Sequence, residues 1–135
     1  MKRRVVITGI GVLTPIGIGK EEFYNSLLEG KSGIDKITRF DTEGFGTKIA
    51  GEVKGFNPED YIDKKEARRM DRFTQYAIAG SRMAIEDSKL DLENIDKDRF
   101  GVILGCGIGG IETFEDQFHT YKERGARRIS PFFIP

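Results

Sequence analysis

A cluster of four glycines is the part of this sequence whose residue types and spacing could do chemistry. Gly105, Gly107, Gly109 and Gly110 lie within six residues. Glycine is used where the backbone takes a positive φ, or where a ligand or a second backbone approaches closely. The glycines themselves leave two interpretations open, tight packing of a strand on a helix or a dinucleotide-binding loop. A third interpretation depends on the rest of the chain.

The residues on either side of this glycine loop predict the elements that position it. Residues 102–104 form a continuous apolar run, Val-Ile-Leu, which favours a strand buried on both faces. After the loop, apolar residues recur at helical spacing, at Ile111, Phe114, Phe118 and Tyr121. We therefore expect the loop at a strand-to-helix junction.

The glycine spacing also matches a dinucleotide-binding fingerprint, Gly105-x-Gly107-x-x-Gly110. That motif requires a second strand after the helix, ending in an acidic residue that binds the ribose. Here the helix is followed by Arg-Arg-Ile-Ser-Pro at residues 127–131. A dinucleotide-binding oxidoreductase is therefore kept only as the less favoured alternative.

Cys106 and His119 are the one cysteine and the one histidine of the chain. A thiol becomes nucleophilic when a neighbouring histidine, cation or helix dipole stabilises the thiolate. No histidine or cation adjoins Cys106 in the sequence, so we expect a buried and inert side chain. His119 is expected on the surface or in packing. This composition also excludes an intrachain disulfide and a histidine-rich zinc centre, and we predict no metal site.

A basic stripe is the second candidate functional feature. Four basic residues stand at i, i+3, i+4 and i+7, the spacing of one helix face, at Lys65, Arg68, Arg69 and Arg72. A second basic pair follows at Arg127 and Arg128. The stripe is either a solvated face or a docking site. Only Glu66 and Asp71 lie nearby to neutralise it, which favours docking of one acidic partner at one place.

The overall charge excludes other partners. The chain has 22 basic and 22 acidic residues, so no global field attracts nucleic acid or membrane, and we expect neither to bind. The charged and apolar N-terminus resembles a signal peptide, but Gly9, Gly11 and Pro15 interrupt it and no small-x-small cleavage site follows. No run approaches the ~18 apolar residues of a membrane span. We therefore expect a cytoplasmic protein.

The remaining elements are predicted from periodicity and caps. Residues 4–10 predict a first strand and residues 21–29 a helix that ends at Gly30. Residues 31–56 are mostly loop, with a short strand at residues 48–53. Asp63 and Glu66 have the spacing of a capping box.

A long helical pattern follows that cap and runs to Ser88, with a break near Asp71, which could cap a second piece. Several residues on one face of this pattern are small, so we expect a neighbouring backbone to approach it closely. That face contains Met70, Phe73, Ala77, Gly80 and Ala84.

The last residues, 129–135, read Ile-Ser-Pro-Phe-Phe-Ile-Pro. They are apolar and carry no stop signal, so we expect them to be buried against residues that this sequence does not contain. The two confident strands and one doubtful strand are also too few for a covered parallel sheet. We therefore expect residues 1–135 to be the first part of a larger protein.

Taken together, six segments resemble the N-terminal part of a β-ketoacyl-acyl-carrier-protein synthase of type II, a condensing enzyme of the thiolase-like superfamily. The segments are residues 3–11 (RRVVITGIG), 31–34 (KSGI), 40–42 (FDT), 64–71 (KKEARRMD), 105–110 (GCGIGG) and 129–135 (ISPFFIP). The resemblance covers the whole chain. It departs at Cys106, where the family often has Ser or Thr.

The resemblance implies an α/β fold of the thiolase type, layered α/β/α/β/α in the complete protein, which forms a homodimer. It implies a two-stage Claisen condensation with acyl and malonyl groups delivered by acyl carrier protein, and it requires no cofactor. The family's nucleophilic cysteine and its two histidines lie beyond residue 135. We therefore expect no catalytic residue in this chain, and no activity from the chain alone.

Site residues follow from the same resemblance. It implies that Ile108 and Phe133 form the acyl pocket, with Phe133 supplied by the other subunit. It implies a docking surface for acyl carrier protein at Lys65, Arg68, Arg69, Arg127 and Arg128. A catalytically silent homologue that lacks the nucleophile remains an alternative to the active condensing enzyme.

Overall fold

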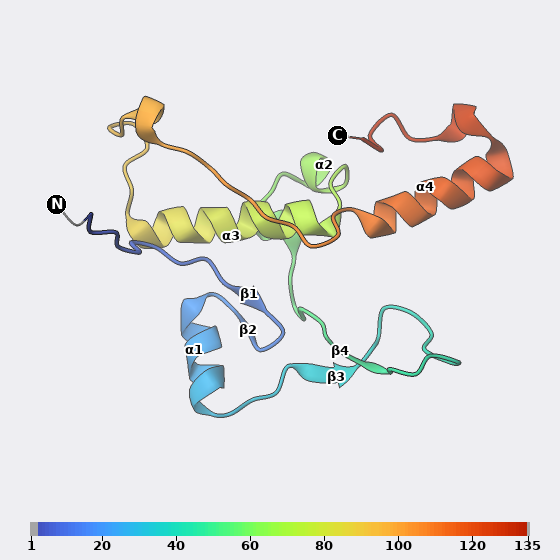
Figure 1. The fold of residues 1–135 in the computed structure, drawn as a ribbon, viewed down its shortest axis with the longest axis horizontal. Helices are drawn as coiled ribbons and strands as arrows, with labels where there is room; N and C mark the ends of the chain where they lie inside the picture. Colours follow the sequence, from blue (N-terminus) through green and yellow to red (C-terminus); the bar gives the residue numbers. More distant parts are fainter. Residues whose placement is uncertain (1–2, 135) are drawn as a thin grey trace. The chain divides into compact units, whose positions relative to one another are not determined.

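The computed structural model describes residues 3–134 and is drawn in Figure 1. The chain forms two compact units, residues 1–57 with 79–93 and residues 58–78 with 94–135. The long helix α3 (Arg72–Ser88) contributes its first turns to the second unit and its remainder to the first. Among the described residues, no helix is both long and apolar enough to cross a membrane.

The first unit begins with a hairpin and a helix. Strand β1 (Leu13–Thr14) pairs antiparallel with β2 (Gly17–Ile18), and α1 (Lys20–Leu28) follows at once. The predicted helix at residues 21–29 is thus confirmed to within one residue at each end. At the start of α1, Lys20 forms an ion pair with Asp87 of α3.

A second antiparallel pair lies after α1. Strand β3 (Ile34–Lys36) pairs with β4 (Ile49–Gly51), with Asp35 opposite Ala50. The strand predicted at residues 48–53 is confirmed as β4. Its partner β3 was not predicted, because three residues show too little alternation to be recognised.

Small residues bring the N-terminal segment directly onto α3. A Cβ atom added at Gly9 would lie 2.1 Å from the carbonyl oxygen of Ala84, and one added at Gly11 would lie 1.8 Å from that of Gly80. Both distances are far below van der Waals contact. The close approach predicted for Gly80 and Ala84 is therefore confirmed.

Two predicted strands are wrong. Residues 4–10 and 102–104 form no ladder, and Val102, Ile103 and Leu104 are 71%, 97% and 65% exposed. A strand exists only where a neighbouring strand accepts and donates its backbone hydrogen bonds. No described residue does so for either segment, and their apolar side chains remain in solvent.

The second unit is built from helices and turns. Asp63 caps α2 by accepting a hydrogen bond from the Lys65 amide at 2.8 Å, so the cap at Asp63 is confirmed. The reciprocal bond from Glu66 that would complete a capping box is absent among the described residues. The chain then breaks before α3, as predicted near Asp71. The elements of this unit are η1 (Pro58–Asp60), α2 (Lys64–Ala67), the start of α3, η2 (Lys97–Arg99), α4 (Ile111–Arg124) and η3 (Ala126–Arg128).

Burial is slight in both units. Among residues 3–134, the buried apolar side chains are Ile62, Ala67 and Ala79. Near the C-terminus, Phe132 and Ile134 are exposed, at 46% and 85%, whereas Ile129 and Phe133 are half-buried. The burial of this segment against residues outside the sequence stays a prediction. Many large apolar side chains thus lack a covering layer within the described residues.

Candidate functional site

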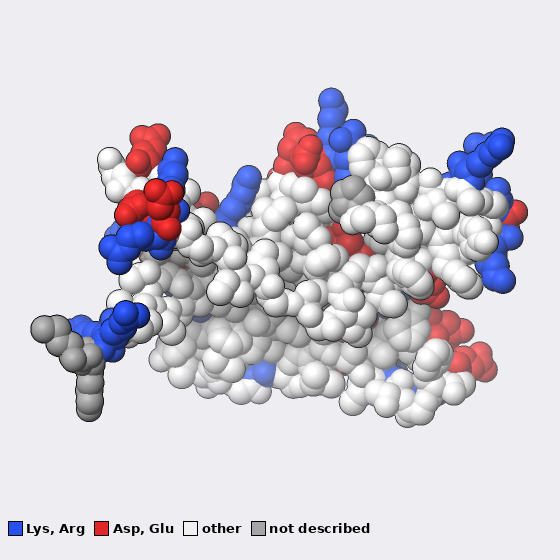
Figure 2. All heavy atoms as spheres, turned by 45° about the horizontal axis from the view of Figure 1, so that its top comes forward, with Lys and Arg blue, Asp and Glu red and all other residues white. Residues whose placement is uncertain are grey.

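The basic residues of the second unit form two groups. Figure 2 shows one group of basic side chains near α2 and another beyond the end of α4, with uncharged surface between them. The first contains Lys65 and Arg68, the second Arg127 and Arg128 in η3, and all four are exposed. No ion pair joins any of these four to an acidic side chain within residues 3–134.

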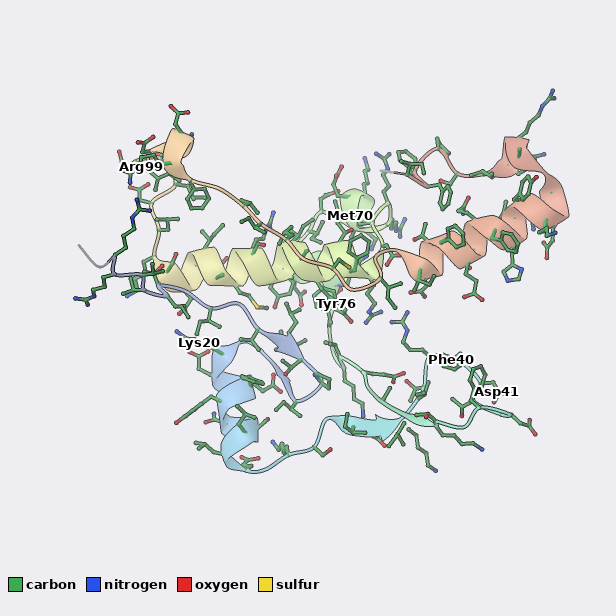
Figure 3. All side chains as sticks on the ribbon, in the orientation of Figure 1. Lys20, Phe40, Asp41, Met70, Tyr76 and Arg99 are labelled. Carbon is green, nitrogen blue, oxygen red and sulfur yellow. The ribbon has the colours of Figure 1, made fainter. Side chains whose placement is uncertain are left out.

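The break between α2 and α3 changes the predicted stripe. A single face at i, i+3, i+4 and i+7 requires one continuous helix, but α2 ends at Ala67 and α3 begins at Arg72. Arg72 instead donates from Nε to the hydroxyl of Tyr76 at 2.7 Å, one turn further along α3. Tyr76 is labelled in Figure 3. The stripe of four is therefore wrong, and Arg72 does not belong to the exposed basic group.

Gln75 holds the break in place. Its Nε2 donates to the carbonyl oxygens of Ala67 at 2.9 Å and Met70 at 3.3 Å. Both carbonyls lie at or just beyond the end of α2. The Ala67 carbonyl also accepts from the Met70 amide at 3.3 Å, whereas no backbone amide of the described residues donates to the Met70 carbonyl. Gln75 thereby fixes the segment that carries Arg68 and Arg69.

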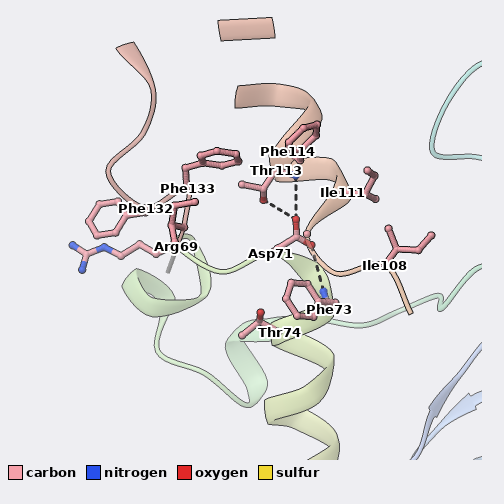
Figure 4. Close-up of a pocket in the computed structure, with 12 residues that line it drawn as sticks. Arg69, Asp71, Phe73, Thr74, Ile108, Ile111, Thr113, Phe114, Phe132 and Phe133 are labelled. Carbon is pink, nitrogen blue, oxygen red and sulfur yellow. Dashed lines mark hydrogen bonds between the residues drawn. The ribbon is translucent and has the colours of Figure 1, made fainter. Parts of the chain in front are cut away.

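A hollow of about 460 Å³ lies beside this segment (Figure 4). Its polar lining includes Arg69, Asp71 and Thr113. Its apolar lining comes from the glycine loop, α4 and the C-terminal segment, at Ile108, Ile111, Phe114, Phe132, Phe133 and Ile134. The structure thus brings together Ile108 and Phe133, the two residues predicted for an acyl pocket.

Ile108 projects from the glycine loop with free space around it. It is 80% exposed, and a Cβ added at Gly107 would meet no atom within 4 Å. Gly109 has a φ of +83°, which a residue with a side chain rarely adopts. The loop therefore turns at Gly109 and presents Ile108 to the hollow.

Phe133 reaches the hollow by packing on α4. Its ring centroid lies 6.1 Å from that of Phe114, with the planes tilted by 38°. Nearby, the amide of Ser130 donates to Oε1 of Gln117 at 2.6 Å. The two residues Ile108 and Phe133 share this hollow within one chain; the contribution of Phe133 from another subunit stays a prediction.

Arg69 links the basic segment to the C-terminal segment. Its guanidinium carbon lies 4.7 Å from the ring centroid of Phe132, within the range of a cation–π contact. Figure 4 shows the Arg69 side chain extended beside that ring. The residue predicted for docking thus also lines the hollow.

Asp71 joins the start of α3 to the start of α4. Its Oδ2 accepts from the Thr113 hydroxyl at 2.6 Å and the Thr113 amide at 3.1 Å, and its Oδ1 accepts from the Phe73 amide at 3.4 Å. Burial raises the pKa of this carboxyl. The hydrogen bonds from Thr113, Phe73 and Arg72 outweigh that effect and hold the pKa below its ordinary value of 3.8.

This carboxylate argues against a dinucleotide loop. In such loops the pyrophosphate lies at the helix N-terminus, where backbone amides and the dipole favour a negative charge. Here the Thr113 amide in the first turn of α4 already donates its hydrogen bond to Asp71. No strand precedes the loop at residues 102–104 and none follows α4 among the described residues. The other interpretation of the loop, tight packing, applies to one of its four glycines: a Cβ added at Gly110 would lie 3.2 Å from Asp71 Oδ2, whereas one added at the other three would meet no atom within 4 Å.

Cys106 and His119 show no catalytic arrangement. Cys106 is exposed, which corrects the expected burial, and its sulfur accepts a hydrogen bond from the Gly109 amide at 3.2 Å. His119 lies on α4, 4.0 Å from a carboxylate oxygen of Glu115 and mostly exposed, as predicted. Among residues 3–134, no three acidic, histidine or cysteine side chains gather as metal ligands.

Sequence reasoning missed the contacts of Gln75 and the Asp71–Thr113 pair. Asp71 was predicted as a cap of the second helical piece, but its bond to a residue 42 positions later leaves no local signal. Gly110 was the available signal for this contact. As the N-cap residue of α4 it has no side chain, so the capping acceptor must come from elsewhere in the chain.

Comparison with known proteins identifies the family of this chain. A family model described as the N-terminal domain of β-ketoacyl synthase matches residues 2–135. The chain is 56% identical over 133 residues to a 3-oxoacyl-[acyl-carrier-protein] synthase 2 from Staphylococcus aureus, covering 98% of this chain and 32% of that protein. It thus spans about a third of the length of the curated relatives that it matches.

Solved structures give the same result. The ishigamide ketosynthase/chain length factor superposes with a TM-score of 0.79 at 36% identity, over 98% of this chain and 33% of that one. A type II polyketide synthase (PKS) acyl-carrier protein in complex with its ketosynthase matches with a TM-score of 0.78 at 26% identity, over 98% and 35%. These neighbours confirm the predicted thiolase-like α/β fold class. Because the family model spans nearly the whole chain, this protein belongs to the β-ketoacyl synthase family, of which it contains the N-terminal domain.

Proposed function

We propose that this chain is the N-terminal third of a 3-oxoacyl-acyl-carrier-protein synthase II, an acyltransferase that lengthens fatty-acyl chains by two carbons. The observation that carries the proposal is the 56% identity to an enzyme of that name across 98% of the chain. The nucleophile and the histidines then belong to the remaining two thirds of the enzyme.

The reaction has two stages. A cysteine thiolate attacks the acyl thioester, which forms a new thioester on the enzyme and releases the carrier thiol. Malonyl-carrier protein then loses CO₂, and the resulting carbanion attacks the enzyme thioester. A carbon–carbon bond forms, the tetrahedral oxyanion collapses, and the carbon–sulfur bond breaks to regenerate the cysteine thiolate. Decarboxylation supplies the carbanion, so the proposed reaction requires no cofactor.

In this proposal the part of the hollow beside Ile108 receives the end of the acyl chain of the same subunit, and Phe133 reaches the acyl pocket of the partner subunit across the interface of a homodimer. The apolar side chains of Ile108, Phe114 and Phe133 support contact with an acyl chain, because such a chain is stabilised by about 0.8 kcal/mol for each methylene removed from water.

The two basic groups would dock acyl carrier protein. The structural neighbour with a bound acyl-carrier protein supports this partner. The 14 residues of α4, which leads to the second group, are about 21 Å long, and a standard interface of about 800 Å² per partner is roughly 30 Å across. One acidic partner could therefore contact Lys65, Arg68 and Arg69 together with Arg127 and Arg128. We place the complete enzyme in the cytoplasm.

The experiment uses the complete enzyme that carries this chain, with acyl- and malonyl-carrier protein. Intact-mass spectrometry should detect one acyl group per subunit, and chromatography should detect a 3-oxoacyl product two carbons longer. Binding of carrier protein without acylation would identify a catalytically silent homologue. Tight binding of a nicotinamide cofactor, with no acylation, would instead support an oxidoreductase.

A further inference from the structure

The first turn of α4 receives its cap from a distant part of the chain. Its own N-cap residue is Gly110, which has no side chain to accept a hydrogen bond. Asp71 provides the missing acceptor, since its Oδ2 binds both the amide and the hydroxyl of Thr113. The other oxygen binds the Phe73 amide in the first turn of α3. One carboxylate therefore caps two helices.

The Asp71 carboxylate lies very close to the backbone at Gly110. A Cβ at residue 110 would lie 3.2 Å from Asp71 Oδ2 and 3.5 Å from the Phe73 ring, so glycine permits the approach. The partial positive charge of a helix N-terminus favours an anion at this place, and here two N-termini face the same anion. Loss of the charge would weaken the attachment of both.

The start of α4 in turn determines the walls of the hollow. Ile108 lies two residues before Gly110, so it moves with the helix start. Phe133 packs on Phe114 in the first turn of α4. Figure 4 shows Asp71 between Thr113 and Phe73, with Ile108 and Phe133 on the walls around it. A shift of α4 against α3 would therefore move both walls together.

We propose that Asp71 is a positioning residue for acyl-chain selection: by joining the starts of α3 and α4 it fixes where Ile108 stands in the acyl pocket of its own subunit and where Phe133 stands toward the pocket of the partner subunit. The inference rests on the proposed function, because it takes Ile108 and Phe133 to line acyl pockets. Asp71 itself makes and breaks no bond in the reaction.

The test compares kcat/KM for short and long acyl-carrier substrates in the complete enzyme. Asp71→Asn removes the charge, and Thr113→Val removes the hydroxyl while keeping the shape. Either should change the ratio of long-chain to short-chain kcat/KM by about tenfold, which corresponds to about 1.4 kcal/mol. Thr113→Ser keeps a hydroxyl and should restore the wild-type ratio. The double variant should be no worse than Asp71→Asn, because both changes break the same contact.

A matched control removes a cap elsewhere in the same unit. Asp96 caps η2 by accepting from the Asp98 amide at 3.2 Å and does not line the hollow. Asp96→Asn should leave the chain-length ratio unchanged.

The outcomes separate the two proposals. An active wild-type enzyme whose Asp71 and Thr113 variants lose rate equally at every chain length would overturn the inference alone. A folded wild-type enzyme that never condenses would overturn the proposed function and the inference with it. If Asp71→Asn does not fold, Thr113→Val decides, and an unchanged ratio in that variant would overturn the inference.

Discussion

Replacing Ile108 by phenylalanine is expected to shorten the acyl chains that the complete enzyme accepts. Ile108 projects from the glycine loop into a hollow of about 460 Å³, and the larger ring would occupy part of that space. Each methylene kept out of an apolar site forfeits about 0.8 kcal/mol, about fourfold in a binding constant. Exclusion of two methylenes would therefore cost roughly fifteenfold. Overpacking of a tight apolar site typically costs about 1–3 kcal/mol, which corresponds to a comparable loss of roughly 5- to 150-fold in a binding constant.

The assay measures kcat/KM for a series of acyl-carrier substrates of increasing length. Loss should begin at the length that first reaches Ile108, and shorter chains should react at the wild-type rate. Ile108→Ala enlarges the hollow and should retain the long chains. Leu28→Phe adds bulk at a 70% exposed position of α1 outside the hollow and should not change the length profile. A uniform loss at every length in Ile108→Phe would refute the assignment of Ile108 to the pocket.

Three further predictions concern the surroundings of the pocket. The double charge reversal of Lys65 and Arg68 to Glu should raise the KM for carrier protein several-fold and weaken its salt dependence, because exposed charges act over roughly 8–10 Å. The double variant should leave decarboxylation of a small malonyl thioester unchanged, and equal loss with both substrates would mean a damaged fold. As a control, the charge reversal Lys97→Glu on η2 should not change the KM for carrier protein. Gln75→Ala leaves the Met70 carbonyl without its donor and removes one of the two donors to the Ala67 carbonyl, so it should lower the free energy of unfolding by about 1–3 kcal/mol. Urea titration measures this change, and unaltered stability would show that solvent replaces the amide. Because the pKa of Asp71 lies below its ordinary value of 3.8, its stabilising effect is complete above about pH 4 and is lost as the pH falls through the lowered pKa. Asp71→Asn should therefore be less stable than wild type at pH 7, and the gap should close in acid; a gap that persists at pH 2 would contradict this origin.

Local sequence patterns were enough to predict α1, the position of α4 and the break before α3. Residues 21–29, the helix after the glycine loop and the break near Asp71 were all predicted, because a helix is built from hydrogen bonds four residues apart and from caps that adjoin it. Family membership was also readable, since six short segments in order are specific where each alone is weak. The exposed basic residues Lys65 and Arg68 followed from composition and spacing.

Contacts between residues far apart in the sequence could not be predicted from such patterns. The apolar runs at residues 4–10 and 102–104 have the composition of strands, but a strand forms only against a partner, and no described residue provides one. The predicted basic stripe was divided because Gln75 and Tyr76 stabilise a break and withdraw Arg72. The bond between Asp71 and Thr113 spans 42 positions. No local pattern encodes such a contact, because its geometry arises from the packing of one helix start against another.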